Sequence, residues 1–255
     1  MTEIEPEEIL NIASTAGRLV LESGGETYRT EDTIVSIARS MGAKKASAFV
    51  TPTVIIVTGT DENNCNHSAM ERIRNRSVNL KRIAQVNSLS RKLASRETPS
   101  NPVQVGQLLA QIEAASTYPS WFIILASGFC SLFNIVLYKG TWQEAAISFV
   151  ISMLIRLFLL YIGRFTIPSF LVSLLAGVFI SVLSEFSAFI GLAAGSGRVT
   201  SAVLIMVVPG LATVNAVRDI IAGDLVSGNA RLTDAFMTAA GLSVGTAFGV
   251  LLLPF

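Results

Sequence analysis

The second half of this chain consists of long apolar runs separated by short polar turns, and this pattern restricts the fold more than any other feature. A helix that crosses a membrane needs about 20 predominantly apolar residues, and several such runs follow Tyr118. Charged residues make up 15% of the chain, whereas soluble domains average about a quarter. We therefore expect two regions, a soluble domain over residues 1–117 and a transmembrane domain over residues 118–255.

The soluble region changes its periodicity along the chain, as a small α+β domain does. Apolar residues recur at helical spacing from Glu7 to Ser23, and again from Thr30, the expected N-cap, to Met41. Short β-branched runs then predict strands, before helical spacing returns. The strands are expected over 46–50, 53–58 and 70–77, and the later helices over 79–95 and 103–116, joined by a linker over 97–102.

Four charged residues surround the Gly24-Gly25 turn that ends the first predicted helix. They are Glu26, Arg29, Glu31 and Asp32. Acidic residues favour the positive N-terminus of a helix, so capping explains much of this pattern. A ligand site or a gate in the soluble domain is the functional alternative.

The apolar region predicts an all-α bundle of about five transmembrane helices. The expected spans cover 118–138, 142–162, 167–192, a fourth that starts near Thr200 and breaks at Pro209-Gly210, and 232–253. An odd number places the two termini on opposite sides. Basic residues cluster between Arg72 and Arg96, and the positive-inside rule then predicts that the N-terminal domain lies in the cytoplasm. The protein as a whole is expected in the inner (plasma) membrane. The cluster also suits a helix face beside anionic lipid of the bilayer.

Several function classes find little support in the residues. The net charge of +1 gives no field that favours nucleic acid. His67 is the only histidine and lies two residues from Cys65, whereas zinc needs three or four ligands. We therefore expect no metal, no cofactor and no catalytic group, and predict that the protein is not an enzyme. The acidic beginning MTEIEPEEIL lacks the pattern of a cleaved signal peptide.

Charged and polar residues inside the apolar region are the candidates for a substrate path, because they are costly at membrane depth. The stretch from Val207 to Leu232 combines a Pro-Gly break with several of them. They are Pro209, Gly210, Asn215, Arg218, Asp219, Asp224 and Ser227. Asn215 and Asp219 share one helix face, and Arg218 suits a carboxylate. The alternative is a helix end with ordinary surface charges.

Two further charged residues lie within other predicted spans, Arg156 in the second and Glu185 in the third. They are either part of the transport path or a buried ion pair that needs no substrate. In the last span, Gly241, Gly245 and Gly249 recur every fourth residue and form a small face. That face allows a second helix to approach closely, either from this chain or from another subunit.

Several segments together resemble the threonine/serine exporter family, ThrE. They are the sequence NLKRIAQVNSLSR at 79–91, Tyr118-Pro119 at the first span, the sequence VPGLATVNAVRDIIAGDLVSGNARL at 208–232, and Gly24 to Asp32 in the soluble region. The length and layout are similar to the split form of the family, the YjjP-like subunit. The most specific part runs from Pro209 through Arg231.

The resemblance implies export of small amino acids (threonine and serine) or of a dicarboxylate such as succinate, driven by the proton motive force. It also implies a partner, either a shorter membrane subunit of the YjjB type or further copies in a homo-oligomer. A membrane-anchored cytoplasmic sensor or scaffold without transport activity is the alternative function. The broken span and the intramembrane charges argue against it, because a simple anchor needs neither.

Overall fold

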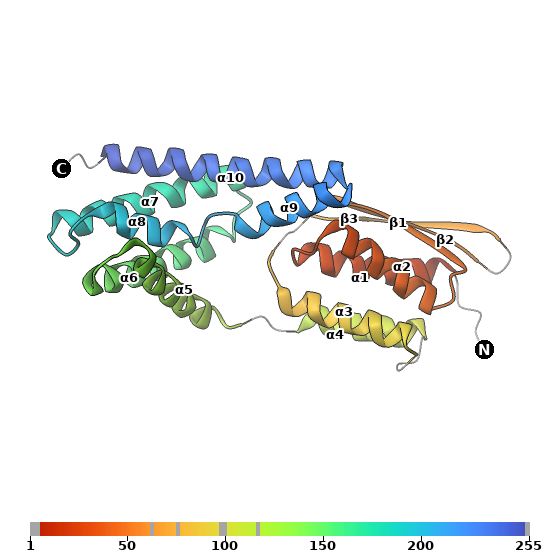
Figure 1. The fold of residues 1–255 in the computed structure, drawn as a ribbon. Coiled ribbons are helices and arrows are strands. Elements are labelled where there is room, and N and C mark those ends of the chain that lie inside the picture. Colours follow the sequence, from red (N-terminus) through yellow and green to blue (C-terminus); the bar gives the residue numbers. More distant parts are fainter. Residues whose placement is uncertain (1–5, 62–63, 75–76, 97–100, 116–117, 253–255) are drawn as a thin grey trace. The chain divides into compact units, whose positions relative to one another are not determined.

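The computed structural model describes residues 6–61, 64–74, 77–96, 101–115 and 118–252, which form two compact units (Figure 1). The first unit takes in residues 1–117 together with 211–232, and the second takes in 118–210 together with 233–255. The segment 211–232 was expected in the transmembrane domain. It belongs to the first unit because its polar side chains bond there, as described below.

The first unit has an α+β fold. Its elements are α1 (Pro6–Glu22), α2 (Thr27–Ser40), β1 (Lys45–Thr51), β2 (Val54–Thr60), β3 (Asn66–Arg72), α3 (Leu80–Ala94), α4 (Pro102–Ala114), α9 (Gly210–Ala222) and the beginning of α10 (Leu225–Leu252). The predicted N-cap at Thr30 was wrong, because α2 begins three residues earlier with Glu26 at its N-cap. The third strand lies over 66–72 rather than 70–77, and part of the predicted linker lies outside the described residues.

The sheet is antiparallel with the order β1-β2-β3. Alternate residues of β1 and β2 are buried, as in a sheet with one covered face. Helix α1 contacts α2, α3, α4 and the strands β2 and β3, and Figure 1 shows α1 and α2 between the sheet and the pair α3 and α4. The core of the unit therefore forms around α1, with Leu19, Ile34 and Ile55 fully buried.

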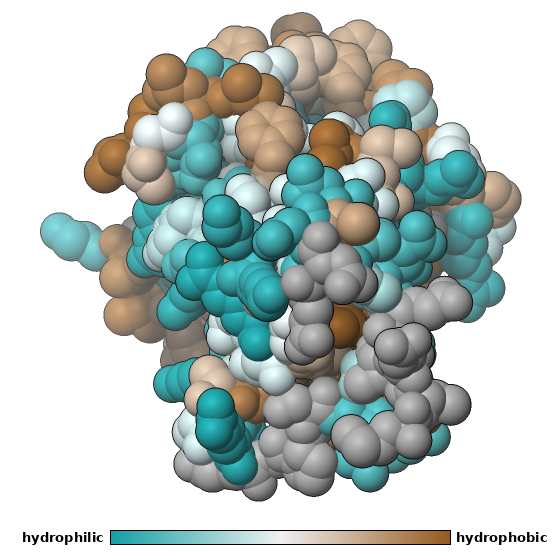
Figure 2. All heavy atoms as spheres, turned by 90° about the vertical axis from the view of Figure 1, so that its right-hand side faces the viewer, coloured by the Kyte–Doolittle hydropathy of each residue, from teal (hydrophilic) through white to brown (hydrophobic). Residues whose placement is uncertain are grey.

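Arg18 of α1 binds Glu113 of α4 through an ion pair between the two helices. Its Nη1 and Nη2 lie 2.9 Å and 3.0 Å from the two carboxylate oxygens of Glu113. This bidentate hydrogen bond raises the pKa of Arg18 and lowers the pKa of Glu113. Seen from the right-hand side of Figure 1, the surface in Figure 2 carries hydrophilic residues over much of its centre and apolar residues along its upper edge.

The second unit is helical. Its elements are α5 (Ser120–Asn134), the short 3₁₀ helix η1 (Ile135–Tyr138), α6 (Trp142–Ile162), α7 (Ser169–Phe189), α8 (Ser196–Leu204) and the larger part of α10. Within the described residues, four segments are long and apolar enough to cross a membrane: 120–138, 142–162, 169–189 and 225–252. The first three match predicted spans closely.

The predicted count of five long spans was not confirmed. Where the fourth was expected, α8 has only nine residues and α9 begins again at Gly210. Pro209 accounts for the interruption, because it has no N–H to bond the carbonyl oxygen of residue 205. The last predicted span begins seven residues earlier than expected, at Leu225.

The small face of α10 packs within this chain. A Cβ atom added to Gly245 would collide with the backbone of Leu174 in α7, and one added to Gly241 would lie 2.7 Å from the carbonyl oxygen of Phe170. Gly177 of α7 is in equally close contact with α10. The glycines therefore allow the two helix backbones to touch, as the first of the two interpretations predicts.

Candidate functional site

The polar residues of the segment 211–232 gather on one buried surface of the first unit. Helix α9 buries Asn215, Ala216 and Asp219, and the first turns of α10 bury Ser227 and Arg231. Gly223 joins the two helices with a φ of 97°, a conformation that suits glycine. Gly228 lies against Ile220 and the carbonyl of Ala216, so the helices meet closely.

This surface binds the turn at residues 24–27 in the soluble region. Asn215 Nδ2 donates to the carbonyl oxygen of Gly24 at 2.8 Å, and Arg231 Nη2 donates to that of Gly25 at 2.8 Å. Four consecutive residues of the turn are bonded in this way, since Glu26 and Thr27 contact Arg218 and Asp219 as described next. Two of the segments that resemble the threonine/serine exporter family, one around the turn at 24–27 and one over 211–232, thus bond to each other.

Asp219 lies at the centre of this contact with no exposed surface. Its two carboxylate oxygens accept hydrogen bonds from the backbone N–H of Thr27 at 3.0 Å and from the Thr27 hydroxyl at 2.9 Å. Arg231 Nε lies 3.1 Å from the same carboxylate. Because Thr27 is the first residue of α2, Asp219 places a negative charge at the helix N-terminus, where the helix dipole favours it.

Glu26 forms a second ion pair at the same turn. Its Oε1 lies 2.6 Å from Arg218 Nη1, and its Oε2 lies 3.4 Å from Arg29 Nη1. Burial of Glu26 opposes ionisation, but the hydrogen bond from Arg218 and the charges of both arginines outweigh it and lower the pKa of Glu26. The Arg218 side chain remains 57% exposed, so this pair is only partly shielded from water.

Two further acidic residues have raised pKa values. Burial, only partly offset by a hydrogen bond from the N–H of Val50 at 2.9 Å, raises the pKa of Glu31, and repulsion from Asp224 adds to it. Burial and the nearby charge of Asp219 raise the pKa of Asp224. Ser227 donates to the carbonyl oxygen of Val50 at 3.1 Å. The backbone N–H of Val50 is therefore bonded by Glu31 of α2, and its carbonyl oxygen by Ser227 of α10.

The soluble-domain residues that were predicted as one site are thus distributed. Glu26 and Arg29 lie at the bonded turn, and Glu31 contacts β1. Asp32 instead lines a separate polar cavity of about 500 Å³, together with Arg39 and Arg96.

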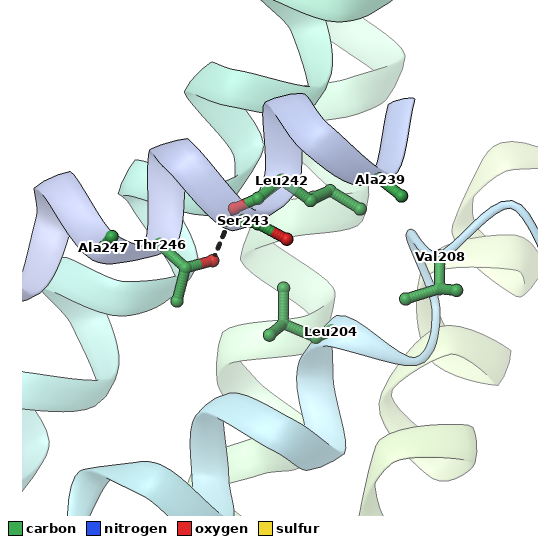
Figure 3. Close-up of a pocket in the computed structure, with 7 residues that line it drawn as sticks. All are labelled: Leu204, Val208, Ala239, Leu242, Ser243, Thr246 and Ala247. Carbon is green, nitrogen blue, oxygen red and sulfur yellow. Dashed lines mark hydrogen bonds between the residues drawn. The ribbon is translucent and has the colours of Figure 1, made fainter. Parts of the chain in front are cut away.

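In the second unit, a cavity lies beside the helix break. It has a volume of about 440 Å³ and is lined by Leu204, Val208, Ala239, Leu242, Ser243, Thr246 and Ala247. Figure 3 shows the α10 residues on one side and Leu204 and Val208, from the end of α8 and the break, on the other. The Thr246 hydroxyl donates to the carbonyl oxygen of Leu242 at 2.7 Å. The size falls within the usual range of small-molecule sites.

The intramembrane charges do not pair as one of the interpretations proposed. Glu185 accepts a hydrogen bond from Ser196 at 2.7 Å, and Arg156 forms no ion pair with it in the described part of the chain. Arg198 instead pairs with Glu144 at 2.9 Å, where Glu144 has no exposed surface and the Arg198 side chain is 39% exposed. Sequence reasoning missed this pair, because 54 residues separate the partners and neither helical spacing nor hydropathy connects them.

A sequence model of the family described as "Putative threonine/serine exporter" matches residues 11–253. The chain belongs to the threonine/serine exporter family. The match takes in both units, and with it both halves of the contact between 24–27 and 211–232. A member of this family with four apolar helices of spanning length is a multi-pass membrane protein.

Curated relatives of the chain have related names. It is 22% identical over 245 residues to a "Probable threonine/serine exporter" of Mycobacterium tuberculosis, covering 95% of this chain and 46% of that protein. It is 24% identical over 246 residues to a "Probable succinate transporter subunit YjjP" of Klebsiella aerogenes, covering 91% and 88%. It is 24% identical over 237 residues to "Pheromone-regulated membrane protein 10" of Zygosaccharomyces rouxii, covering 90% and 24%.

The chain therefore spans less than half of the length of the mycobacterial and yeast relatives and most of the length of the Klebsiella one. No solved structure matches it. Among the described residues, no group of three or more His, Cys, Asp and Glu side chains is arranged to hold a metal ion.

Proposed function

We propose that this chain is one subunit of a secondary exporter that moves small amino acids such as threonine and serine, or a dicarboxylate such as succinate, out of the cell. The proton motive force drives this transport. The observation that carries the proposal is the interrupted helix between α8 and α9, with a cavity of about 440 Å³ beside it. Broken helices with adjoining cavities form the substrate sites of many secondary transporters.

Chain connectivity supports a crossing at this break. Three long apolar helices, α5 to α7, carry the chain to the opposite side of the membrane, yet residues 211–232 belong to the same unit as residues 1–117. The chain must therefore return between Phe189 and Leu211. Nine residues of α8 span about 14 Å, and residues 205–208 continue as hydrogen-bonded turns. The crossing at the break is therefore shorter than a regular span of about 30 Å.

A helix that ends inside the membrane leaves its last carbonyl groups without helical partners. Such groups are tolerated only where protein or a water-filled cavity receives them. Pro209 and Gly210 create this ending, and Ser243 and Thr246 supply hydroxyl groups across the cavity. This part of the chain therefore offers hydrogen-bond acceptors and donors to a small polar substrate.

The bonded surface of the first unit has a different role in this proposal. Asn215, Asp219 and Ser227 are buried and have their hydrogen bonds within the unit, so they are not available to a substrate in this conformation. Arg218 donates to Glu26 and is 57% exposed. Because α9 follows the break directly and α10 lines the cavity, we assign these residues and Asp224 to a gate. Movement of the turn at 24–27 would then alter the helices that enclose the substrate.

In the cell, the first unit lies in the cytoplasm and the protein in the inner (plasma) membrane. The basic residues between Arg72 and Arg96, together with Arg218 and Arg231, all belong to the first unit, as the positive-inside rule requires of the cytoplasmic side. The Klebsiella relative is named as a subunit, and a shorter membrane protein of the YjjB type, or further copies of this chain, completes the transporter.

Efflux measurements test the proposal. Cells that lack their own exporters are loaded with labelled threonine, serine and succinate, with and without this chain and the shorter membrane protein encoded beside it. Faster efflux of at least one substrate is expected. Unchanged efflux of all three in every combination would refute export and favour a membrane-anchored sensor or scaffold.

Cavity-filling variants localise the path. Ser243→Leu and Ala247→Leu each place a larger, apolar side chain in the cavity of about 440 Å³, and slower efflux is expected because the added side chain obstructs the path. Val244→Leu is the matched control, since Val244 is exposed on α10 and does not line the cavity. Equal efflux in all three variants would place the path elsewhere.

A further inference from the structure

Arg156 is an arginine within a membrane-spanning helix, and it has no counter-charge among the residues that the structure describes. It lies 14 residues after the start of α6 and 6 before its end, roughly 21 Å and 9 Å along the axis. Its Nε–H is buried and has no hydrogen-bond partner, and no carboxylate of the described chain pairs with its guanidinium group. A charge in this position is costly and needs compensation.

The acidic residues of the membrane-spanning helices are already engaged. Glu144 pairs with Arg198 at 2.9 Å, Glu185 accepts from Ser196 at 2.7 Å, and Asp234 accepts from Ser169 at 3.4 Å. Arg198 shows how this bundle satisfies an arginine when a carboxylate is within reach. Arg156 lacks that arrangement, so a carboxylate from outside the chain is the simplest group that would complete it.

The helix faces show what surrounds Arg156. Gly128 of α5 lies against the side chains of Phe149 and Met153, and the rings of Phe129 and Phe149 are 5.2 Å apart. Arg156 follows Phe149 by seven residues, which is two helical turns. It therefore projects from the side of α6 that faces α5.

A hydroxyl group without a partner lies on the same face of α6. Ser152, one turn before Arg156, is 1% exposed. Its hydroxyl has no hydrogen-bond partner in the described chain. Buried polar groups are normally bonded, so an unpaired donor one turn from an unpaired arginine indicates a place where an acceptor ligand binds.

We infer that Arg156, with the hydroxyl of Ser152, forms an intramembrane site for the carboxylate group of the transported molecule. A planar guanidinium group binds a carboxylate through two parallel hydrogen bonds, and hydroxyls donate to its remaining lone pairs. Amino acids and dicarboxylates share this group. The inference rests on the proposed export function and names the chemistry that the substrate must present.

Binding to the full chain in lipid nanodiscs, with its partner subunit where one is needed, tests the inference. The ligands are labelled threonine, labelled succinate, and threoninol, in which a hydroxymethyl group replaces the carboxylate. In Arg156→Gln the Kd for threonine or succinate should rise at least ten-fold, whereas the Kd for threoninol should not change. Arg164→Gln is the matched control, because Arg164 is exposed in the loop after α6 and loses the same charge.

Two further variants guard against a merely structural effect. Arg156→Lys retains a charge that can reach the membrane surface. Lysine cannot form the two parallel hydrogen bonds of a planar guanidinium group, so several-fold weaker carboxylate binding is expected. Ser152→Ala should weaken it by a few-fold. If Arg156→Gln does not insert into the membrane, these two variants decide the matter.

The outcomes separate the two proposals. Unchanged carboxylate affinity in the Arg156 and Ser152 variants of an exporting protein would overturn the carboxylate site and leave export intact. Equal losses for threoninol and threonine would also overturn it, because the arginine would then act on folding rather than on the carboxylate. A wild-type chain that neither exports nor binds any of these ligands would remove both proposals.

Discussion

Replacing Asp219 by alanine tests whether the signature segment is held to the soluble domain as the structure indicates. The change removes the acceptor of the Thr27 N–H and hydroxyl and leaves Arg231, which is 9% exposed, without its carboxylate. Breaking a buried ion pair from one side typically costs about 3–5 kcal/mol. Since about 1.4 kcal/mol is a factor of ten in an equilibrium constant, local opening at 24–27 should increase roughly 10²- to 10³-fold.

Hydrogen exchange of the full-length protein, followed by mass spectrometry of peptides that contain Gly24 to Thr30, measures this opening. Peptides from α3 provide an internal reference, because none of the bonds of Asp219 reach that helix. Exchange near Thr27 should accelerate strongly while α3 stays protected. A change of less than ten-fold near Thr27 would refute the assigned geometry.

Arg218→Ala is the matched comparison on the same helix. The Arg218 side chain is 57% exposed, and exposed ion pairs contribute about 0–1 kcal/mol. Exchange should therefore rise by no more than about five-fold. The double variant Asp219→Ala with Arg231→Leu should recover part of the loss, because it leaves no buried charge unpaired. If the gate proposal holds, Asp219→Ala also impairs efflux while the protein remains in the membrane.

Three other predictions concern pH and packing. The folded chain binds a proton at Glu31 more tightly than the unfolded chain does, because the pKa of Glu31 is raised. The stability of the fold should therefore fall as the pH rises from the ordinary glutamate pKa toward the raised one. In thermal unfolding scans, Glu31→Gln should flatten this dependence of stability on pH. A slope that persists in the variant would assign it to another group. The lowered pKa of Glu26 has the opposite sign, so its stabilisation should be lost as the pH falls through the folded value, and Arg218→Ala should reduce that acid sensitivity. Gly245→Leu should lower the yield of folded protein sharply, whereas Val244→Leu should not, because only Gly245 lies against the α7 backbone; equal yields would contradict the α7–α10 contact.

The long apolar helices were predictable because a bilayer imposes one length on every span. Residues 142–162 were predicted from hydropathy and form α6 with those bounds. The start of α10 was not predictable in the same way. Ser227 and Arg231 suggest a polar segment before the span, yet the helix begins at Leu225 because both side chains find partners in the first unit.

The short elements of the soluble region show a second limit of prediction from the sequence. The sequence places a cap at Thr30, since threonine followed by acidic residues is typical of a helix N-terminus. Instead α2 begins at Thr27, and its first N–H is bonded by Asp219, 192 residues further along the chain. A cap supplied from so far away leaves no local pattern, so the beginning of this helix could not be found from its neighbourhood.

The same long-range contact explains why the polar residues of 209–231 were interpreted as a substrate path. Sequence reasoning singled out these residues, because charges beside a Pro-Gly break have a high energetic cost in an apolar run. It could not show that Gly24, Gly25 and Thr27 supply the groups that offset this cost. Buried polar groups must be bonded, and those of α9 are bonded within the first unit. Unsatisfied groups in the second unit, such as those of Arg156 and Ser152, are therefore the better candidates for contact with a substrate.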